Sequence, residues 1–327
     1  MSGINTAALF TLQQQDIEAA ALELFHYQYR ENDLYRAYTD ALRRKPADVR
    51  SLLQIPFLPI QFFKTHAVTC GQFTPELIFE SSGTTQTINS RHLVKEAAVY
   101  EQSFLTAFEQ FYGPVSDFVV LGLLPSYLER KHSSLVYMVQ DMVKRSGHAA
   151  SGFYLYEHDK LAAHLQELEA RQQKTLLIGV TFGLLDFAEH YNLELKNTIV
   201  METGGMKGRR EEWTRQQVHQ YLKDRLGCTH IHAEYGMTEL LSQAYSFGDG
   251  IFTTPPWMKV LVRDESDPFQ LSVANASGVI NVIDLANVYS CAFIATEDIG
   301  KIKADGAFEV LGRLDNSALR GCSLMVS

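Results

Sequence analysis

The segment TLLIGVTFGLLDF, from Thr175 to Phe187, is the most apolar stretch of the sequence and sets the interpretation of the rest. Its first part, Leu176 to Val180, is a short continuous apolar run of the kind found in strands that are buried on both faces. The whole segment is shorter than the roughly 20 residues that a membrane-spanning helix needs. We therefore expect a buried strand here and no membrane span.

Short apolar runs of the same kind recur at Phe118–Leu124, Thr198–Met201 and Thr229–Ala233. Segments with a helical spacing of apolar residues alternate with them. These segments are Ile17–Tyr27, Leu135–Val143 before a capping glycine at Gly147, Leu161–Leu168 and Glu211–Leu226. Short buried strands that alternate with helices predict an α/β fold with a mostly parallel sheet.

The pattern changes after about residue 245, where proline and glycine become more frequent and helical periodicity fades. Strands are expected at Met258–Val262 and Val279–Ile283. The segment KIKADGAFEVLG, Lys301 to Gly312, is predicted to form a β-hairpin that turns at Asp305 and Gly306. This part of the chain is therefore expected to be rich in β-structure.

The composition excludes several classes of function. The 327 residues are 46% hydrophobic and 20% charged, which supports a substantial core rather than global disorder. A net charge of −9 gives no sign of a nucleic-acid surface. The four cysteines lack C-x-x-C spacing, which argues against a zinc site or a disulfide framework. Because the N-terminus also lacks the features of a signal peptide, a cytoplasmic protein with reduced thiols is expected.

The segment FESSGTTQTINSRH, Phe79 to His92, surrounds a glycine with hydroxyl side chains. Backbone N–H groups in such a loop, from Ser81 to Thr85, can surround an anion. The segment is not a P-loop, because it lacks the G-x-x-x-x-G-K-[ST] pattern. A polar surface turn explains these residues equally well, so both interpretations stay open.

The segment HAEYGMTELL, His232 to Leu241, places an aromatic ring, a glycine, a hydroxyl and a carboxylate directly after an apolar run. Tyr235 can stack on a base, Thr238 can donate a hydrogen bond to a phosphate, and Glu239 can hold Mg²⁺, which prefers oxygen ligands. The alternative is a core aromatic residue at Tyr235 and an ordinary ion pair at Glu239.

The segment ATEDIGKIKADGAFEVLGRLDNS, Ala295 to Ser317, contains two residues suited to a nucleotide. Asp298, just before Gly300, can accept hydrogen bonds from ribose hydroxyls. Arg313, after Gly312, can reach a phosphate, because guanidinium is always charged and forms paired hydrogen bonds with oxygen atoms. A surface hairpin with ordinary charged residues is the alternative.

Taken in order, Ser-Ser-Gly-Thr-Thr, Tyr-Gly-Met-Thr-Glu, Asp-x-Gly and Gly-Arg-x-Asp resemble the motif series of the adenylate-forming enzymes, which include acyl-CoA ligases. Within that superfamily, the chain is similar to the acyl-protein synthetases of the bacterial bioluminescence fatty-acid reductase complex. The segments that carry this closer resemblance are LFHYQYREND (Leu24–Asp33), IPFLPIQFFKTH (Ile55–His66), PSYLERKHSSLVYM (Pro125–Met138) and RGCSLM (Arg320–Met325).

The resemblance implies an adenylation domain over residues 1–312, with a β-rich subdomain from about residue 245 and a short tail over residues 313–327. Such a domain uses ATP and Mg²⁺ to convert a carboxylic acid into an acyl-adenylate. The implied phosphate ligands are Ser81, Ser82, Gly83, Thr84 and Thr85 at the β- and γ-phosphates and Thr238 at a phosphate. Gly204, Gly205 and Tyr235 are implied at adenine, and Gly236, which permits a tight bend, is also counted as a cofactor-binding residue. Glu239 is implied at Mg²⁺, Asp298 at the ribose, and Arg313 at ribose or phosphate.

The chain departs from the superfamily pattern in two ways. The family loop continues to a lysine, whereas Gln86 to Ser90 contains none, and Arg91 is the nearest candidate for that charge. Superfamily ligases also carry a mobile C-terminal domain with a catalytic lysine, whereas 14 residues follow Arg313 here. Acyl-protein synthetases likewise end soon after this point, and a cysteine near their C-terminus accepts the acyl group. Cys322 matches that position, and a nearby cation at Arg320 favours a thiolate, although a buried structural cysteine is the alternative.

By resemblance, the substrate is a fatty acid, Cys322 is acylated, and the partner is an NADPH-dependent acyl reductase. Two further hypotheses are an adenylating subunit that passes its acyl group to CoA, a carrier protein or an amine, and a nucleotide-binding homologue without catalysis. Some roles stay open: His132 lines the acyl or phosphate site, or precedes a helix capped by Ser133. His230 and His232 form a metal pair or have buried, hydrogen-bonded roles.

Overall fold

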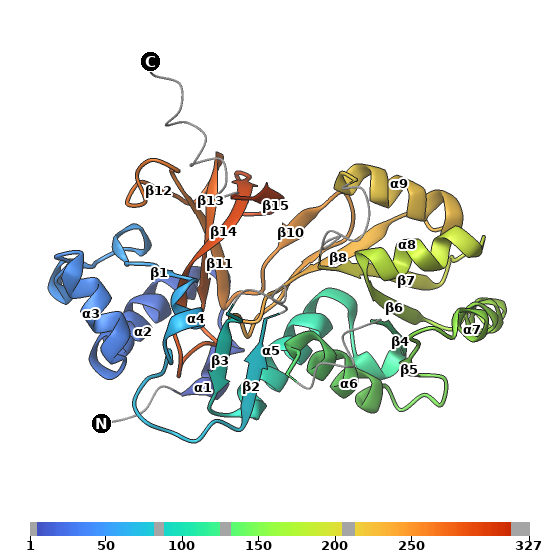
Figure 1. The fold of residues 1–327 in the computed structure, drawn as a ribbon, viewed down its shortest axis with the longest axis horizontal. Helices are drawn as coiled ribbons and strands as arrows, with labels where there is room; N and C mark the ends of the chain where they lie inside the picture. Colours follow the sequence, from blue (N-terminus) through green and yellow to red (C-terminus); the bar gives the residue numbers. More distant parts are fainter. Residues whose placement is uncertain (1–4, 82–87, 125–131, 205–212, 315–327) are drawn as a thin grey trace, which may run out of the picture.

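The computed structural model describes residues 5–81, 88–124, 132–204 and 213–314, and Figure 1 shows their arrangement. One continuous sheet runs through these residues, with a parallel part from the middle of the sequence joined to an antiparallel part from later residues. In the described residues, no helix has both the length and the apolar character needed to cross a membrane.

The parallel part consists of β4 (Val119–Leu123), β5 (Gly152–Phe153), β6 (Thr175–Val180), β7 (Thr198–Thr203) and β8 (Ile231–Tyr235). These strands lie in the order β5-β4-β6-β7-β8, and each neighbouring pair is parallel. The predicted parallel sheet is therefore confirmed. The last strand extends to Tyr235, beyond its predicted end at Ala233, because β7 and the following strand pair with its polar residue Glu234.

Helices cover both faces of the parallel part. Side chains on a strand alternate between the faces, and β4 shows the division: Val119, Leu121 and Leu123 lie in one core and Val120 lies in the other. In the first core, the parallel part is covered by α7 (His158–Ala170), α8 (Thr181–His190) and α9 (Arg215–Leu226). In the second, which also includes residues of the N-terminal helices, it is covered by α5 (Ala97–Tyr112) and α6 (Ser134–Ser146).

The ends of two helices follow from their capping residues. The helix α6 ends before Gly147, as predicted, and this glycine has the left-handed φ of 67° that is typical of a helix C-terminus. The helix α9 begins at Arg215 and not at Glu211, so the predicted start was wrong. Thr214 caps α9 and forms a reciprocal capping box with Gln217, which fixes the first turn at this position.

The antiparallel part consists of β9 (Ala244–Ser246), β10 (Ile251–Thr253), β11 (Met258–Arg263), β12 (Leu271–Ser272), β13 (Ala276–Asp284), β14 (Phe293–Ile302) and β15 (Phe308–Arg313). The strand β9 pairs with β8, and the order continues β9-β10-β15-β14-β13-β11-β12. The predicted hairpin is confirmed as β14 and β15. Its turn contains Gly306 with a φ of 86°, a conformation that favours glycine.

The N-terminal segment packs against the antiparallel part. The strand β1 (Leu58–Pro59) pairs in parallel with β14. From α2 (Ile17–Glu31), the buried Gln28 amide donates to the Val288 carbonyl oxygen at 3.0 Å and accepts from the Ala292 N–H at 2.9 Å. Gln28 and Val288 are 260 positions apart in the sequence. The remaining α-helices of the described residues are α1 (Thr6–Leu9), α3 (Asp33–Ala41) and α4 (Phe62–Thr65).

A separate two-stranded sheet lies between the two parts of the main sheet (Figure 1). It is formed by β2 (Leu77–Glu80) and β3 (Arg91–Val94), which pair antiparallel. The hydroxyl-rich segment predicted over Phe79 to His92 therefore has its ends in these strands. Its middle, residues 82–87, lies outside the described residues.

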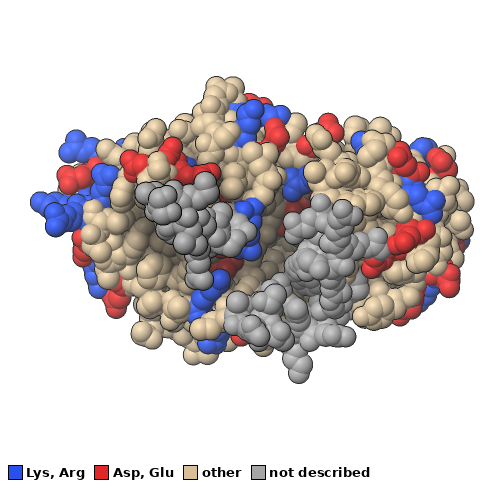
Figure 2. Space-filling model, turned by 45° about the horizontal axis from the view of Figure 1, so that its top comes forward, with Lys and Arg blue, Asp and Glu red and all other residues tan. Residues whose placement is uncertain are grey.

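Figure 2 shows residues of both charges on the described part of one face. Lys and Arg side chains, in blue, are interspersed there with Asp and Glu side chains, in red. Among the described residues of this face, the basic side chains form no extended field of the kind that follows a nucleic-acid backbone.

Candidate functional site

The predicted site lies at the carboxyl ends of β7 and β8, where open α/β sheets bind their ligands. Gly204 follows β7 with a φ of 74°, and Gly236 follows β8. Of the predicted site residues, the structure describes Ser81, Gly204, Tyr235, Gly236, Thr238, Glu239, Asp298 and Arg313. Ser82, Gly83, Thr84, Thr85, Gly205 and Cys322 lie outside the described residues.

Three predicted residues meet at the end of β8. The Tyr235 hydroxyl donates to Asp298 Oδ2 at 2.9 Å. Arg313 lies opposite Asp298 in the β14–β15 pair, and its Nε is 4.0 Å from Asp298 Oδ1. The Tyr235 ring packs edge-on against Phe308 and is only 8% exposed. This burial matches the core-aromatic interpretation of Tyr235, and its stacking on adenine stays a prediction.

The surroundings of Asp298 shift the pKa of its carboxyl in opposite directions. Burial raises the pKa of the Asp298 carboxyl above its ordinary value, while the hydrogen bond from Tyr235 and the positive charge of Arg313 lower it. The Arg313 guanidinium also lies 3.5 Å from Glu297 Oε2, and its side chain is 69% exposed. The arrangement keeps a carboxylate acceptor and an accessible cation side by side.

The segment after Gly236 is held through its backbone. His92 Nδ1 lies 2.9 Å from the Thr238 carbonyl oxygen, and the Asn287 amide donates to the Glu239 carbonyl oxygen at 2.8 Å. Burial lowers the pKa of His92 to about 4, so the ring is neutral near pH 7. These contacts come from β3 and from the turn after β13, and they fix the segment that carries the predicted phosphate and Mg²⁺ ligands.

Asp284, at the end of β13, holds the residues that follow. Its carboxylate accepts from the N–H of Leu241 at 2.7 Å, from the N–H of Ser242 at 3.0 Å and from the Ser242 hydroxyl at 2.6 Å. The Ala286 N–H is a fourth donor at 3.1 Å. The roles of Asp284, His92 and Asn287 were not predicted from the sequence. Asp284 and Asn287 are polar residues inside an apolar stretch, and this was the signal that could have identified these two.

The Glu239 side chain contacts Ser90, near the C-terminal end of the hydroxyl-rich segment. Its side chain is buried, and burial raises the pKa of the carboxyl, while the Ser90 hydroxyl and the positive charges of Arg313 and Lys64 oppose that rise. Ser90 in turn pairs with Ser81: the Ser90 N–H donates to Ser81 Oγ at 2.8 Å and the Ser81 N–H donates to the Ser90 carbonyl at 3.0 Å. The described ends of this segment therefore lie beside Glu239.

The Glu239 carboxylate is a suitable ligand for Mg²⁺. This ion binds oxygen and takes one or two carboxylates together with phosphate oxygens, rather than a cage made only of protein ligands. No group of three or more His, Cys, Asp and Glu side chains within the described ranges could hold a metal ion. His230 and His232 therefore lack a third ligand there, and His232 Nδ1 instead lies 3.2 Å from the Tyr112 hydroxyl.

Glu234 is a second buried carboxyl that sequence reasoning did not identify. Thr203 donates to it from β7, and burial raises its pKa to about 7. A Cβ atom placed on Gly236 would lie 2.3 Å from Glu234 Oε1, so a side chain there would displace this carboxyl. Position 236 therefore has a steric reason to be glycine.

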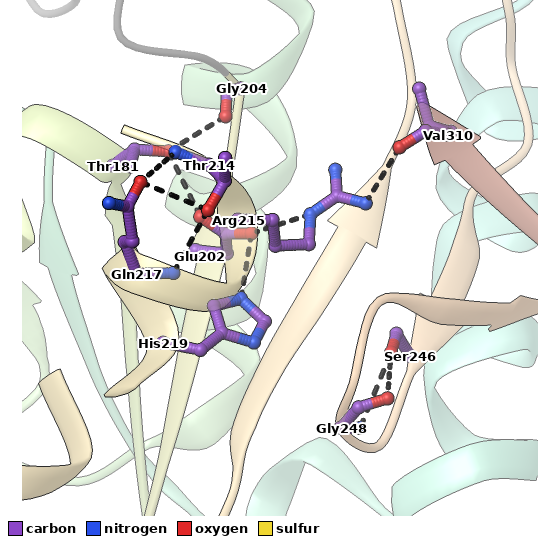
Figure 3. Close-up of polar contacts among 10 residues, drawn as sticks. All are labelled: Thr181, Glu202, Gly204, Thr214, Arg215, Gln217, His219, Ser246, Gly248 and Val310. Atoms are coloured by element: carbon purple, nitrogen blue, oxygen red, sulfur yellow. Dashed lines mark hydrogen bonds and ion pairs between the residues drawn. The ribbon is translucent and has the colours of Figure 1, made fainter. Parts of the chain in front are cut away.

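Thr181 links Gly204 to a cluster of polar and charged side chains (Figure 3). Thr181 Oγ1 lies 2.8 Å from the Gly204 carbonyl oxygen and 3.1 Å from Glu202 Oε2. Glu202 Oε1 lies 3.0 Å from His219 Nε2 and 3.3 Å from Arg215 Nε. The Arg215 guanidinium extends from α9 across to β15, as Figure 3 shows, and donates to the Val310 carbonyl oxygen at 3.2 Å.

Other predicted candidates have local roles. Arg91 lies 3.6 Å from Glu80 in an exposed ion pair. His132 Nδ1 lies 3.1 Å from the Ile78 carbonyl oxygen, and Ser133 caps α6 as the alternative interpretation predicted.

No protein-family model matches the sequence, and no curated protein matches it. Solved structures do match. The fold aligns with 2-hydroxyisobutyryl-CoA ligase in complex with 2-HIB-AMP and CoA, over 93% of this chain and 68% of that one, with a TM-score of 0.68 and 12% identity. It also aligns with ATP-bound MatB from Rhodopseudomonas palustris, over 74% of this chain and 49% of that one, with a TM-score of 0.55 and 19% identity. The fold is that of the adenylate-forming ligases.

The predicted fold class is therefore confirmed, and the likeness is one of fold. The matched region spans about half the length of MatB and of a MatB chimera that also aligns. It corresponds to the N-terminal portion of the adenylate-forming ligases, and their C-terminal domain is not covered.

Proposed function

We propose that this chain activates a carboxylic acid with ATP, forming an acyl-adenylate and pyrophosphate. The observation that carries the proposal is the convergence of described residues from every motif at one place. Ser90, which pairs with Ser81, contacts Glu239. The charge of Arg313 acts on both Glu239 and Asp298. Residues far apart in the sequence thus supply hydroxyl, carboxylate and guanidinium groups to one site.

The reaction requires an anion to attack an anion. A carboxylate oxygen forms a bond to the α-phosphorus of ATP, the bond to the bridging oxygen breaks, and pyrophosphate leaves. Thr238 and Arg313 are suited to hold phosphate oxygens and to offset charge in the transition state. When bound, Mg²⁺ supplies further positive charge at the phosphates, with Glu239 as its protein ligand. Asp298 is suited to accept hydrogen bonds from the ribose.

Cys322 is the proposed acyl acceptor. Its thiolate would attack the acyl carbonyl carbon, form the thioester and release AMP. The described cysteines are poor alternatives: Cys70, Cys228 and Cys291 are all buried. Burial raises the pKa of the Cys228 thiol to about 11 and that of Cys291 to about 12, which disfavours the nucleophilic thiolate. The proposed substrate is a fatty acid, and the proposed recipient of the acyl group is an acyl reductase.

A second candidate is transfer of the acyl group to CoA. It is favoured by the alignment with 2-hydroxyisobutyryl-CoA ligase, which was solved with CoA in the thioesterification state. The variant Cys322→Ser separates the two candidates. Loss of a protein-bound thioester with full retention of adenylation supports Cys322 as acceptor, whereas CoA thioester formation that is unaffected by the variant supports the second candidate.

Carboxylate-dependent exchange between ATP and pyrophosphate tests the proposal without an acceptor or a partner. Acids from acetate through long-chain fatty acids to benzoates should be compared, and one class should support exchange. Glu239→Gln should lower that exchange about 100-fold, because the carboxylate that fits Mg²⁺ is lost. The matched control is Glu194→Gln, an exposed surface residue, which should exchange like the unaltered protein. Clear ATP binding without exchange for any acid would contradict the proposal.

A further inference from the structure

Arg215 connects the parallel and antiparallel parts of the main sheet. It is the first residue of α9, and its guanidinium extends from that helix to β15 (Figure 3). Its Nε donates to Glu202 Oε1 of β7 at 3.3 Å, and a terminal nitrogen donates to the Val310 carbonyl oxygen of β15 at 3.2 Å. The guanidinium carbon also lies 5.2 Å from the centroid of the Phe252 ring in β10, within the range of a cation–π contact.

The place of Arg215 in α9 is unfavourable for a cation without specific contacts. The N-terminus of a helix carries a partial positive charge, and the first turn of α9 contains no acidic residue to offset it. The compensating negative charge comes instead from Glu202, whose side chain is only 7% exposed. The contacts outside α9 therefore explain why an arginine can occupy this position.

Gly250 makes room for the Arg215 side chain. This glycine has a φ of 68°, and a Cβ atom on it would lie 2.7 Å from Arg215 Cδ. The last pair between β10 and β15 is Ile251 with Glu309, so Gly250 would come next, opposite Val310. The pairing stops there, and the Val310 carbonyl oxygen accepts a hydrogen bond from Arg215 instead.

At β7, Arg215 is linked to a proposed adenine ligand. Glu202 Oε1 accepts from Arg215, while Glu202 Oε2 lies 3.1 Å from the Thr181 hydroxyl. The same hydroxyl lies 2.8 Å from the Gly204 carbonyl oxygen. Two side chains thus join the Gly204 backbone to Arg215.

At β15, Arg215 is linked to the proposed ribose and phosphate ligands. Arg313 follows Val310 by three positions, which is about 10 Å along a strand. Arg313 lies opposite Asp298 in the β14–β15 pair. Among the described residues, the pairing of β15 with β10 does not continue beyond Glu309, so the contact with Arg215 holds this edge of β15.

We propose that Arg215 is a positioning residue that fixes β15 against β7 and thereby sets the spacing between Gly204 and Arg313, on opposite sides of the proposed ATP site. The connection between the strands stands on the contacts above. Its effect on ATP rests on the proposed function. An arginine suits this task better than a lysine, because its planar guanidinium offers separate N–H groups to Glu202 and Val310 at the same time.

Hydrogen exchange tests the connection without catalysis. Arg215→Met keeps an unbranched side chain and removes the guanidinium, so the amides of residues 308–313 should exchange at least about fivefold faster in the full-length protein, because this edge opens more easily. Arg225→Met is the matched control. Arg225 also belongs to α9 and donates to two carbonyl oxygens, but these are the oxygens of Ala188 and Glu189 in α8. Exchange over residues 308–313 that is the same in both variants would overturn the connection.

The affinity for ATP tests the positioning role. Calorimetry with ATP and Mg²⁺ requires neither an acid nor an acceptor. Arg215→Met should weaken ATP binding about tenfold, which is less than the roughly 100-fold that a 1 Å misplacement of reacting groups can cost. The KM of the acid in the exchange reaction should stay within about twofold, because the acid is not held by these contacts. Arg225→Met should bind ATP as the unaltered protein does.

Arg215→Lys keeps a positive charge beside Glu202 but cannot make both contacts at once, so it should weaken ATP binding about threefold. This variant also provides the test if Arg215→Met does not fold. Binding by Arg215→Lys that is as tight as in the unaltered protein would mean that the double contact is not needed, and the positioning role would be wrong.

The remaining results separate the positioning role from the proposed function. Equal weakening of ATP binding by Arg215→Met and Arg225→Met would indicate a general loss of stability and would overturn the positioning role. If the unaltered protein binds ATP but no acid supports exchange, the proposed function fails, while the ATP affinities still decide the role of Arg215. If the unaltered protein does not bind ATP, both the proposed function and the positioning role fail, and hydrogen exchange alone decides the connection.

Discussion

Two segments of the candidate site are held in different ways. Thr238–Ser242, on the antiparallel side, is held through its backbone by His92, Asn287 and Asp284. Glu202–Gly204, on the parallel side, is held by the strand pairing of β7 and by side-chain contacts of Glu202 with Arg215 and His219. Backbone contacts fix position whatever side chains the segment carries. Charged contacts also depend on protonation and on salt, so the two sides of the site should respond differently to substitution.

Asp284→Ala should break the backbone-held side and have the largest effect. The substitution removes an acceptor from three buried N–H groups, those of Leu241, Ser242 and Ala286. We expect the free energy of unfolding to fall by about 3–5 kcal/mol, because buried donors without partners are costly. Urea denaturation measures this. Asp117→Ala is the control, because the ion pair of Asp117 with Lys174 is exposed at the surface. If Asp284→Ala lowers the free energy of unfolding no more than this control, the backbone contacts of Asp284 contribute little.

Glu234→Gln tests how the stability of the protein depends on pH, through a buried carboxyl of β8 that binds Thr203 of β7. Burial raises the pKa of Glu234 from 4.5 to about 7 in the folded state. The folded protein therefore binds a proton that the unfolded chain has lost, and the free energy of unfolding falls as pH rises from 4.5 through 7. The difference between the two pKa values corresponds to a loss of about 3 kcal/mol in the free energy of unfolding. Glu234→Gln should remove this loss and stabilise the protein at pH 8.

The measurement is urea denaturation at several pH values from 4.5 to 8. Glu23→Gln, on an exposed position of α2, should leave the profile unchanged. An identical pH profile for Glu234→Gln and the unaltered protein would mean that Glu234 does not account for the predicted slope.

Glu202→Gln should give the smallest effect of the three. The amide oxygen can still accept hydrogen bonds, but the negative charge that attracts the Arg215 guanidinium is lost. We expect a loss of about 1–2 kcal/mol that shrinks as salt is added. The same substitution at Glu167, in an exposed pair with Arg171, should cost about 0.5 kcal/mol or less. Equal losses at the two positions would remove the distinction between this cluster and an ordinary surface ion pair.

Local patterns predicted the fold because its elements have local causes. The apolar run at Leu176–Val180 became β6, and Gly147 ended α6 through its left-handed backbone. The turn at Gly306 placed the β14–β15 hairpin. Boundaries were less predictable where neighbours decide them: β8 continues through Glu234 because adjacent strands pair with it.

From the residues alone, the candidate site could be predicted only as separate motifs, and the resemblance to the adenylate-forming enzymes joined them into one predicted site. Their approach to one another depends on contacts over long sequence separations, such as that between His92 and Thr238, which are 146 positions apart. The sequence could not show that the Tyr235 hydroxyl donates a hydrogen bond to Asp298. Nor could it show that Ser90, at the end of the hydroxyl-rich segment, forms a hydrogen bond with Glu239. The pairing of strands in three dimensions brings these groups together.

The contact between Gln28 and Val288 has a consequence for biosynthesis. These residues are 260 positions apart, and translation at about 5–20 residues per second separates their emergence by roughly 13–52 s. During that interval, the apolar face of α2 has no native partner from β14, whereas β4, β6 and β7 and their helices complete local parallel units. We therefore expect the N-terminal helices to dock last and to need chaperone protection on the ribosome. Ribosome-bound fragments that end before β13 should show α2 sensitive to protease.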